Sequence, residues 1–337
     1  MAVHIDPLPT RDSSEGPGLG APRTITYLRI SVTDRCNLRC RYCMPEDQDF
    51  FPRDHLLHFE ELVAVARVMV DAGVRKIRIT GGEPLMRRQM PKLIEMLRAL
   101  SDDVQLAMTT NAMLLAPHAQ SLRDAGLDRL NVSLDTLRPE RFERISRRAG
   151  LDAAQAGLVA AADAGFTGTK LNSVVMGGFN DDEIPELLTF AHEQGHEQRF
   201  IEFMPLTSNA YGLELKRVPV AEIRRRIETY GPLAPRDKDP GPPGPAETFT
   251  IQSTGQRVGI IAAISLPFCE TCNRVRLTAD GRLRSCLFEG GEVDVRALVR
   301  GADDLDAAVG GALDFLRRVK PPVHDGVGHV QMNQVGG

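Results

Sequence analysis

Six cysteines, grouped in two sets of three, are the residues of this 337-residue sequence with the clearest capacity for chemistry. The first trio comprises Cys36, Cys40 and Cys43, and the second comprises Cys269, Cys272 and Cys286. An even number of cysteines permits three disulfides, but no export signal is visible, and cytosolic thiols remain reduced. We therefore expect the trios to bind metal ions or clusters.

The first trio has the spacing C-x3-C-x2-C and directly follows the first predicted strand. Three thiolates this close in sequence can surround one soft metal centre. Structural zinc and ordinary ferredoxin clusters take four protein ligands, so three cysteines leave one coordination position open for a substrate. A zinc knuckle that borrows a distant fourth ligand is the alternative at this point.

The second trio has the spacing C-x2-C-x13-C and again offers three ligands. Arg274 and Arg276 lie within it, two residues apart, and would share one face of an extended segment. Two guanidinium groups beside an open metal position would suit a phosphate or a purine. A zinc ribbon lacking one cysteine, with an ordinary solvated basic pair, is the alternative that the spacing allows.

The elements that must position these cysteines follow a repeating strand–helix pattern. Apolar residues recur along one helical face within residues 59–70 and 184–191. Short runs rich in Val, Ile, Leu and Phe alternate with the helices, as buried parallel strands do. The predicted strands are residues 25–32, 76–80, 104–109, 129–134, 170–176 and 199–204.

This order of elements predicts a parallel sheet with right-handed crossovers, but periodicity does not separate a doubly wound sheet from a partial barrel. A Pro- and Gly-rich segment then excludes helix and central strand. Strands are predicted at 248–251 and 259–264, and a hairpin turn at 279–281. The predicted parts are a flexible tail (1–23), a barrel region (24–230), a linker or loop (231–246) and a C-terminal region (247–337).

The overall charge narrows the class of protein. Lys and Arg total 41 against 45 Asp and Glu, a net charge of −4, which disfavours a general nucleic-acid binder. A few local arginines could still hold a phosphorylated small molecule. No apolar run approaches the length of a membrane-spanning helix, and we expect a cytoplasmic protein with no membrane partner.

At the first trio the sequence resembles the radical S-adenosylmethionine superfamily. Two further motifs support the resemblance: Gly81-Gly82-Glu83-Pro84 after the second strand and Asn131-Val132-Ser133-Leu134-Asp135 at the end of the fourth. The resemblance implies a [4Fe–4S] cluster on the trio, whose fourth iron chelates the methionyl group. It also implies an α/β fold, a partial (βα)6 TIM-type barrel with a smaller C-terminal α+β region.

Both trios, the Arg-Val-Arg between them and the terminal Gly336-Gly337 resemble, from about residue 23 onward, the radical GTP cyclases that begin molybdenum cofactor biosynthesis. The resemblance implies a second [4Fe–4S] cluster on the second trio, with its open iron binding guanine. It assigns GTP contacts to Arg29, Lys76, Arg78, Thr109, Lys170, Arg274 and Arg276. It assigns S-adenosylmethionine contacts to Tyr42, Gly82, Ser133 and Met204. It assigns catalytic roles to Gly336, Gly337, Arg29, Arg274 and Arg276.

The resemblance also implies the reaction. A 5′-deoxyadenosyl radical abstracts hydrogen from C3′ of GTP, the sugar radical attacks C8, and the product is 3′,8-cyclo-7,8-dihydro-GTP. The implied partners are flavodoxin or ferredoxin as electron donor, cyclic pyranopterin monophosphate synthase as the recipient of the product, and a second copy of the chain in a homodimer. The alternatives are a radical maturase with an auxiliary cluster and a non-catalytic iron–sulfur or zinc interaction module.

Overall fold

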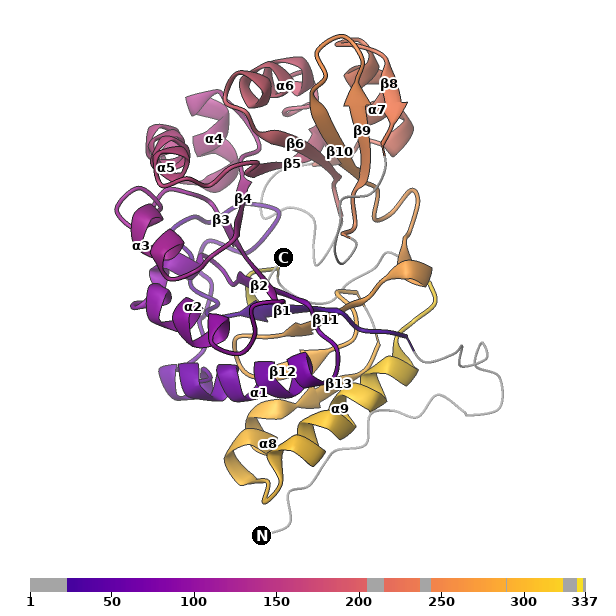
Figure 1. Cartoon of the computed structure of the whole chain (residues 1–337). Coiled ribbons are helices and arrows are strands. Elements are labelled where there is room, and N and C mark those ends of the chain that lie inside the picture. The colour runs from indigo at the N-terminus through magenta and orange to yellow at the C-terminus, as the bar shows by residue number, and fades with distance from the viewer. Residues whose placement is uncertain (1–22, 205–214, 237–243, 289, 324–331, 336–337) are drawn as a thin grey trace.

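The computed structural model describes residues 23–204, 215–236, 244–288, 290–323 and 332–335, which build one curved sheet with helices on its outer face (Figure 1). The order of strands along the sheet is β13-β12-β11-β1-β2-β3-β4-β5-β6-β10-β9-β8, and β7 pairs with β5 alone. The strands are β1 (Tyr27–Ser31), β2 (Lys76–Thr80), β3 (Gln105–Thr110), β4 (Arg129–Ser133), β5 (Lys170–Gly177), β6 (Glu197–Glu202), β7 (Lys216–Arg217), β8 (Leu233–Pro235), β9 (Glu247–Ile251), β10 (Arg257–Ile261), β11 (Arg274–Leu277), β12 (Arg282–Arg284) and β13 (Glu292–Asp294).

The first six strands pair in chain order and are parallel, which confirms the predicted strand–helix repeat. Strand β2 has the predicted bounds, whereas β6 begins at Glu197, before the predicted start at residue 199. The path of strands ends at β13 on one side and β8 on the other, so the sheet stays open. This confirms a partial barrel.

The C-terminal strands extend both edges of this sheet. Strand β10 lies parallel to β6, and β11 lies parallel to β1. The predicted hairpin is present: β11 and β12 are antiparallel around residues 279–281, and Gly281 adopts a φ of +84° that a residue with a Cβ rarely takes. Strand β8 falls within the predicted linker, but at the sheet's edge; residues 237–243 of that linker lie outside the described residues.

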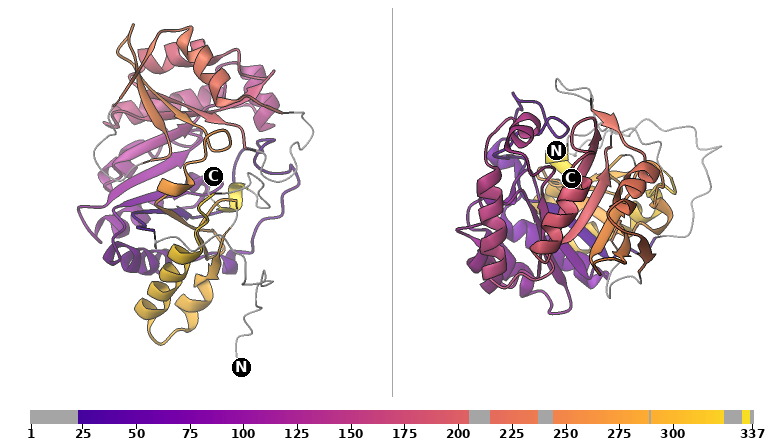
Figure 2. Two further views of the ribbon diagram at one scale, coloured as in Figure 1. Left: turned by 90° about the vertical axis from the view of Figure 1, so that its right-hand side faces the viewer. Right: turned by 90° about the horizontal axis from the view of Figure 1, so that it is seen from above.

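Apart from the short C-terminal helix, whose Met332 lines the lumen, the helices cover the outer, convex face of the sheet in the views of Figures 1 and 2. Side chains alternate along each strand, and the outward set, such as Leu28, Ile30, Ile77 and Ile79, is fully buried beneath the helices. The inward set is left to line a lumen. The helices are α1 (Phe59–Asp71), α2 (Met90–Arg98), α3 (Ala119–Asp124), α4 (Pro139–Ser146), α5 (Leu151–Asp163), α6 (Ile184–Glu193), α7 (Val220–Glu228), α8 (Val295–Gly301), α9 (Leu305–Val319) and α10 (Met332–Val335).

Two predicted segments fall outside what the structure describes. These are the predicted N-terminal tail, except for its last residue, and the terminal pair Gly336 and Gly337. Within the described part of the chain, no helix has both the length and the hydrophobicity needed to cross a bilayer.

Candidate active site

The register of three neighbouring strands aligns arginines that are far apart in the sequence. Arg29 on β1 lies beside Arg78 on β2 and, on its other side, beside Arg276 on β11. Residues in register on adjacent strands point to the same face of a sheet. Three of the predicted GTP-binding arginines therefore form one row across the lumen.

A second row lies two residues earlier on the same strands. There Tyr27 stands between Lys76 and Arg274, and its hydroxyl is hydrogen-bonded to the Nε of Arg78. Burial alone would raise the pKa of Tyr27, but the charges of Arg78, Arg29 and Lys76 outweigh it and lower that pKa to about 7. Sequence reasoning missed Tyr27, whose position becomes meaningful only between cationic neighbours.

Thr109 on β3 accepts a hydrogen bond of 3.1 Å from Arg78 and lies in register with Asn131 on β4. Lys170 on β5 lies beside Glu197 on β6, with 3.7 Å between Nζ and the carboxylate. Glu197 also pairs at 2.6 Å with Arg199, which sequence reasoning missed. Arg199 points into the same lumen from β6.

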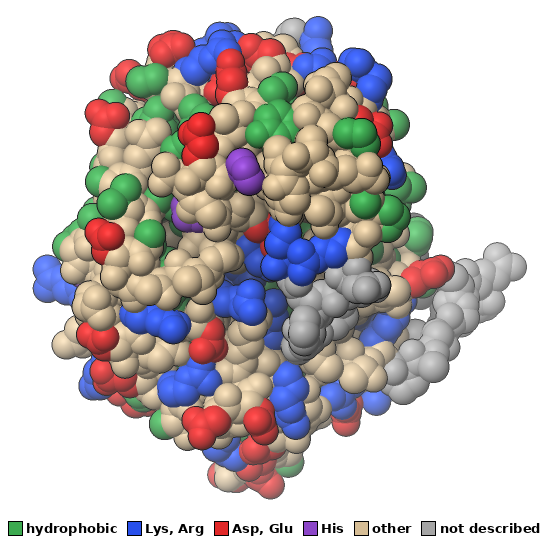
Figure 3. Space-filling model, turned by 45° about the horizontal axis from the view of Figure 1, so that its top comes forward, with side chains coloured by type: hydrophobic (Ala, Val, Ile, Leu, Met, Phe, Trp, Pro, Cys, Tyr) green, Lys and Arg blue, Asp and Glu red, His purple; other side chains and the backbone are tan. Residues whose placement is uncertain are grey.

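The lumen is a cavity whose described lining is strongly cationic. Its charged residues other than cysteine and tyrosine are five arginines and one carboxylate, and Figure 3 shows lysine and arginine side chains gathered around a hollow on this face. A polyanion such as a nucleoside triphosphate matches that charge. The charged lining residues are Arg29, Arg78, Arg199, Arg274, Arg276 and Asp135.

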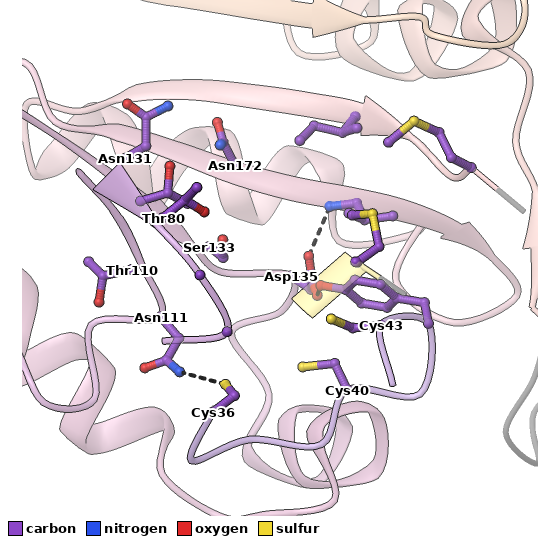
Figure 4. Close-up of a pocket in the computed structure, with 18 of the residues that line it drawn as sticks. Cys36, Cys40, Cys43, Thr80, Thr110, Asn111, Asn131, Ser133, Asp135 and Asn172 are labelled. Carbon is purple, nitrogen blue, oxygen red and sulfur yellow. Dashed lines mark hydrogen bonds between the residues drawn. The ribbon is translucent and has the colours of Figure 1, made fainter. Parts of the chain in front are cut away.

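The first trio lies in the loop after β1, at the carboxyl ends of the parallel strands. All three cysteines line the cavity; Figure 4 shows them on one side of it, opposite polar side chains from β4 and β5. Asn111 at the end of β3 donates a hydrogen bond of 3.7 Å to the Cys36 sulfur. Burial raises the pKa of Cys36 to about 11 and that of Cys43 to about 12.

The two glycines of the Gly81-Gly82-Glu83-Pro84 turn are required by the neighbouring loop. A Cβ on Gly82 would lie 2.3 Å from the carbonyl oxygen of Arg35, too close for any side chain. Glu83 then accepts hydrogen bonds from the backbone N–H of Asn111 and the hydroxyl of Thr110. The turn thus fixes the loop that carries the first trio, and it leaves Gly82 on the cavity wall.

Asp135, which sequence reasoning gave no role of its own, is the carboxylate of the lumen. It accepts a hydrogen bond of 2.7 Å from the Tyr42 hydroxyl and one of 2.9 Å from the Val174 backbone (Figure 4). Burial raises the pKa of Asp135 to about 6, although both hydrogen bonds oppose the shift. Ser133, predicted to bind S-adenosylmethionine, lies two residues earlier on the same cavity wall.

The second trio surrounds an adjoining cavity at the opposite ends of the strands, since Cys272 precedes β11 and β11 runs parallel to β1. Cys269 and Cys272 flank a short 3-10 turn, in which the Cys272 N–H donates to the Cys269 carbonyl at 3.1 Å. Cys286 follows β12 and lines the same cavity. Met204 and Arg276 line this cavity and the central lumen alike, so the two spaces share part of their wall.

The electrostatics of the second trio differ from those of the first. Burial raises the pKa of Cys272, but the charges of Arg274 and Lys320 outweigh it, and that pKa falls to about 6. No carboxylate lines this cavity among the described residues. Cys272 is therefore set to carry a thiolate.

The donor sets fit iron–sulfur clusters. Each trio offers three soft thiol donors without a histidine or carboxylate in the set. Among the described residues, no three His, Cys, Asp or Glu side chains converge on a site for a single metal ion. A cluster is a larger body whose cysteine ligands bind different irons, so more widely spaced thiols suit it.

Comparison with known proteins agrees with this geometry. Residues 30–191 match the model of the radical SAM superfamily, and residues 196–325 match that of molybdenum cofactor synthesis C. A GTP 3′,8-cyclase of Acidothermus cellulolyticus is 46% identical over 313 residues, which cover 91% of this chain and 84% of that protein. A GTP 3′,8-cyclase of Erythrobacter litoralis is 44% identical, over 90% of this chain and 91% of that one. The chain belongs to the GTP 3′,8-cyclase family.

Membership of the GTP 3′,8-cyclase family makes the chain a radical S-adenosylmethionine enzyme of molybdenum cofactor biosynthesis with a [4Fe–4S] cluster. This membership excludes both alternatives that the sequence left open, the maturase and the non-catalytic module. Among solved structures, Streptococcus suis SuiB bound to S-adenosylmethionine has the same fold, with a TM-score of 0.51 and 21% identity. The match covers 61% of this chain and 47% of SuiB, less than half of that protein.

The structure brings most of the predicted site residues of this GTP 3′,8-cyclase family member onto one cavity. Lys76 and Lys170 differ, since they are not on the cavity wall and lie in register with Tyr27 and Asn131 at the amino-terminal side of the lumen. The predicted residues that line the cavity are Arg29, Tyr42, Arg78, Gly82, Thr109, Ser133, Met204, Arg274 and Arg276.

Proposed function

We propose that the chain converts GTP into 3′,8-cyclo-7,8-dihydro-GTP, the first step of molybdenum cofactor biosynthesis. The observation that carries the proposal is a lumen lined by the first trio and five arginines, with the second trio in an adjoining cavity that shares part of its wall. The cyclase name shared by the relatives supports the same reaction.

Cys36, Cys40 and Cys43 hold the first cluster in this proposal. The chemistry that this cluster supplies when bound is the one-electron cleavage of S-adenosylmethionine, the source of the radical that abstracts hydrogen from C3′. The chain's part is to orient the nucleotide: Gly82 offers backbone without a side chain, and Ser133 offers a hydroxyl on the same wall.

The second trio, Cys269, Cys272 and Cys286, holds a second [4Fe–4S] cluster in this proposal. Three thiols leave one iron without a protein ligand, and that open position takes the guanine of GTP. The support is the shared wall of the two cavities, which places a base bound at the second trio next to the lumen that the first trio lines.

The arginines of β1, β2 and β11 bind the phosphates and ribose. Arg29, Arg78 and Arg276 stand in one row, and each presents a planar fork of donors suited to phosphate oxygens. Lys76 and Lys170, at the amino-terminal side of the lumen, complete the cationic end that the triphosphate reaches.

The remaining lining protects reactive intermediates. Apolar side chains from several elements contribute to the wall, and they exclude water from carbon radicals. They include Leu38, Phe142, Ile145, Ile201, Ile261 and Leu287.

Partners and location complete the proposal. Flavodoxin or ferredoxin supplies the low-potential electrons, cyclic pyranopterin monophosphate synthase receives the product, and two copies of the chain associate. Gly336 and Gly337 assist radical initiation once both nucleotides are bound. The enzyme acts in the cytoplasm.

The decisive experiment is anaerobic reconstitution with iron and sulfide, followed by incubation with GTP, S-adenosylmethionine and a low-potential reductant. We expect about eight irons per chain and the 3′,8-cyclised product by mass spectrometry. Replacing GTP by ATP is the matched control and should give no cyclised nucleotide. Zinc without acid-labile sulfide, or intact GTP beside released 5′-deoxyadenosine, would contradict the proposal.

A further inference from the structure

A lysine sits at the second trio without a carboxylate partner in that cavity. Lys320 directly follows the last residue of α9 and is only 7% exposed. A buried ammonium needs hydrogen-bond acceptors or negative charge to offset the loss of water. The described lining of this cavity offers no carboxylate, but it does contain the three cysteines.

The contacts of Lys320 join the two segments that carry those cysteines. Its Nζ donates a hydrogen bond of 2.7 Å to the carbonyl of Arg274, two residues after Cys272. It donates another to the carbonyl of Ser285, the residue immediately before Cys286. One side chain thus ties together chain segments that β11, the hairpin turn and β12 separate in sequence.

The charge of Lys320 adds to that of two arginines. Arg274 and Arg276 line the same cavity, which therefore holds three cationic side chains and three cysteine thiols. A cluster held by three thiolates carries negative charge, which increases when the cluster is reduced. Positive charge and hydrogen bonds close to such a cluster favour its reduced state and raise its reduction potential.

We propose that Lys320 is a positioning residue for the second cluster: it holds the Cys272 and Cys286 segments at ligand distance and stabilises the reduced cluster by its charge. The inference rests on the proposed second cluster. It divides the role of Lys320 into two parts, a hydrogen-bonded tie and a positive charge, which different substitutions can separate.

The test uses the full chain with Cys36, Cys40 and Cys43 replaced by Ser, so that only the second cluster can assemble. Lys320→Arg keeps the charge and donors, Lys320→Gln keeps donors without charge, and Lys320→Met removes both. Arg317→Met is the matched control, because Arg317 donates to the Ala72 carbonyl from the last turn of α9, away from the trio. The readouts are iron and sulfide content and an EPR-monitored redox titration.

We expect about four irons per chain in the background that carries only the three Cys→Ser substitutions, and the same content in the Arg317 control. Lys320→Arg should keep the parental potential, Lys320→Gln should keep its iron but titrate at a more negative potential, and Lys320→Met should lose iron as well. A parental potential and EPR spectrum in Lys320→Gln would overturn the charge role. Full iron in a folded Lys320→Met would overturn the tie.

If Lys320→Met does not fold, the comparison of Lys320→Gln with Lys320→Arg still decides the charge role, because they differ in charge. Failure of the proposed second cluster has a separate signature, namely a background chain that binds no iron and sulfide whatever residue stands at position 320.

Discussion

The two cysteine trios present the same three thiols in opposite electrostatic settings. At the first trio, burial dominates and raises the pKa values of Cys36 and Cys43, with Asp135 as the carboxylate of the cavity wall. At the second trio, Arg274 and Lys320 outweigh burial and lower the pKa of Cys272 to about 6. The difference matches the proposed ligands, since S-adenosylmethionine carries a sulfonium cation and GTP carries a polyanion.

The largest expected effect is that substitutions in the two trios abolish different products. Cys36→Ser, Cys40→Ser or Cys43→Ser should abolish 5′-deoxyadenosine formation, because the electron enters S-adenosylmethionine at the first cluster. Cys269→Ser, Cys272→Ser or Cys286→Ser should abolish cyclisation but leave uncoupled cleavage measurable. Chromatography of both products checks this. Equal loss of 5′-deoxyadenosine in both sets would contradict the division.

The C-terminal segment contacts the chain regions that carry both trios. In α10, Asn333 donates a 3.0 Å hydrogen bond to the carbonyl of Asp34, while Val335 packs with Leu287 and Phe288 beside the second trio. Deleting Gly336 and Gly337 should leave Tm, iron content and GTP binding nearly unchanged, while hydrogen abstraction from C3′ collapses. Full turnover in the truncated chain, measured by product mass, would leave the pair without a role.

Tyr27, which lies among cationic side chains in the lumen, predicts a stability of the folded chain that rises with pH. The phenol of Tyr27 has a pKa of about 7 in the folded chain against an ordinary value of 10, so the folded chain releases this proton at a lower pH than the unfolded chain does. The associated stability is complete above pH 10 and disappears as pH falls through 7. In the ligand-free chain, the difference in unfolding free energy between parent and Tyr27→Phe should therefore grow from pH 7 to 10, by up to about 4 kcal/mol.

Denaturant unfolding across that pH range measures the difference, and tyrosinate absorbance follows the phenol directly. Tyr230→Phe is the control, since Tyr230 packs against a buried cluster that includes Ile223 and Phe249, away from the lumen. An unchanged difference from pH 7 to 10 would show that the arginines do not ionise Tyr27.

Asp135 predicts the opposite pH dependence, a stability of the folded chain that falls as pH rises. Asp135 has a pKa raised to about 6 from 3.8, so the folded chain holds this proton longer and loses stability as pH rises from 4 to 6. Asp135→Asn should therefore gain stability relative to the parent over that range, by about 3 kcal/mol. Denaturant unfolding checks it, with Asp128→Asn, just before β4, as control. A difference that does not vary with pH would contradict the shift.

The smallest expected effect concerns individual GTP contacts. Arg274→Ala or Arg276→Ala should weaken GTP binding by about 1–3 kcal/mol, the scale of one charge-assisted contact, and leave the first cluster's EPR response to S-adenosylmethionine intact. Arg284→Ala is the matched control, because Arg284 pairs across the same hairpin but forms an ion pair with Glu292. Equal GTP affinity in all three variants, measured by equilibrium dialysis, would show that neither Arg274 nor Arg276 contacts GTP.

Local structure could be predicted from the sequence because its causes are local. The bounds of β2 and the hairpin turn at residues 279–281 follow from side-chain alternation and from a glycine that can adopt positive φ. The spacing of each trio likewise limits its ligand chemistry before any fold is known. Partial-barrel topology did not follow from periodicity; it came from the resemblance, and the open sheet confirms it.

Tertiary structure alone decided which distant residues meet. Nothing in the sequence places β10 beside β6 and β11 beside β1, yet these pairings bring the second trio to the lumen. Tyr27, Asp135 and Lys320 were missed for the same reason: a single tyrosine, aspartate or lysine carries no spacing signal. Their chemistry arises from burial and from charges contributed by other strands, and these exist only once the chain has folded.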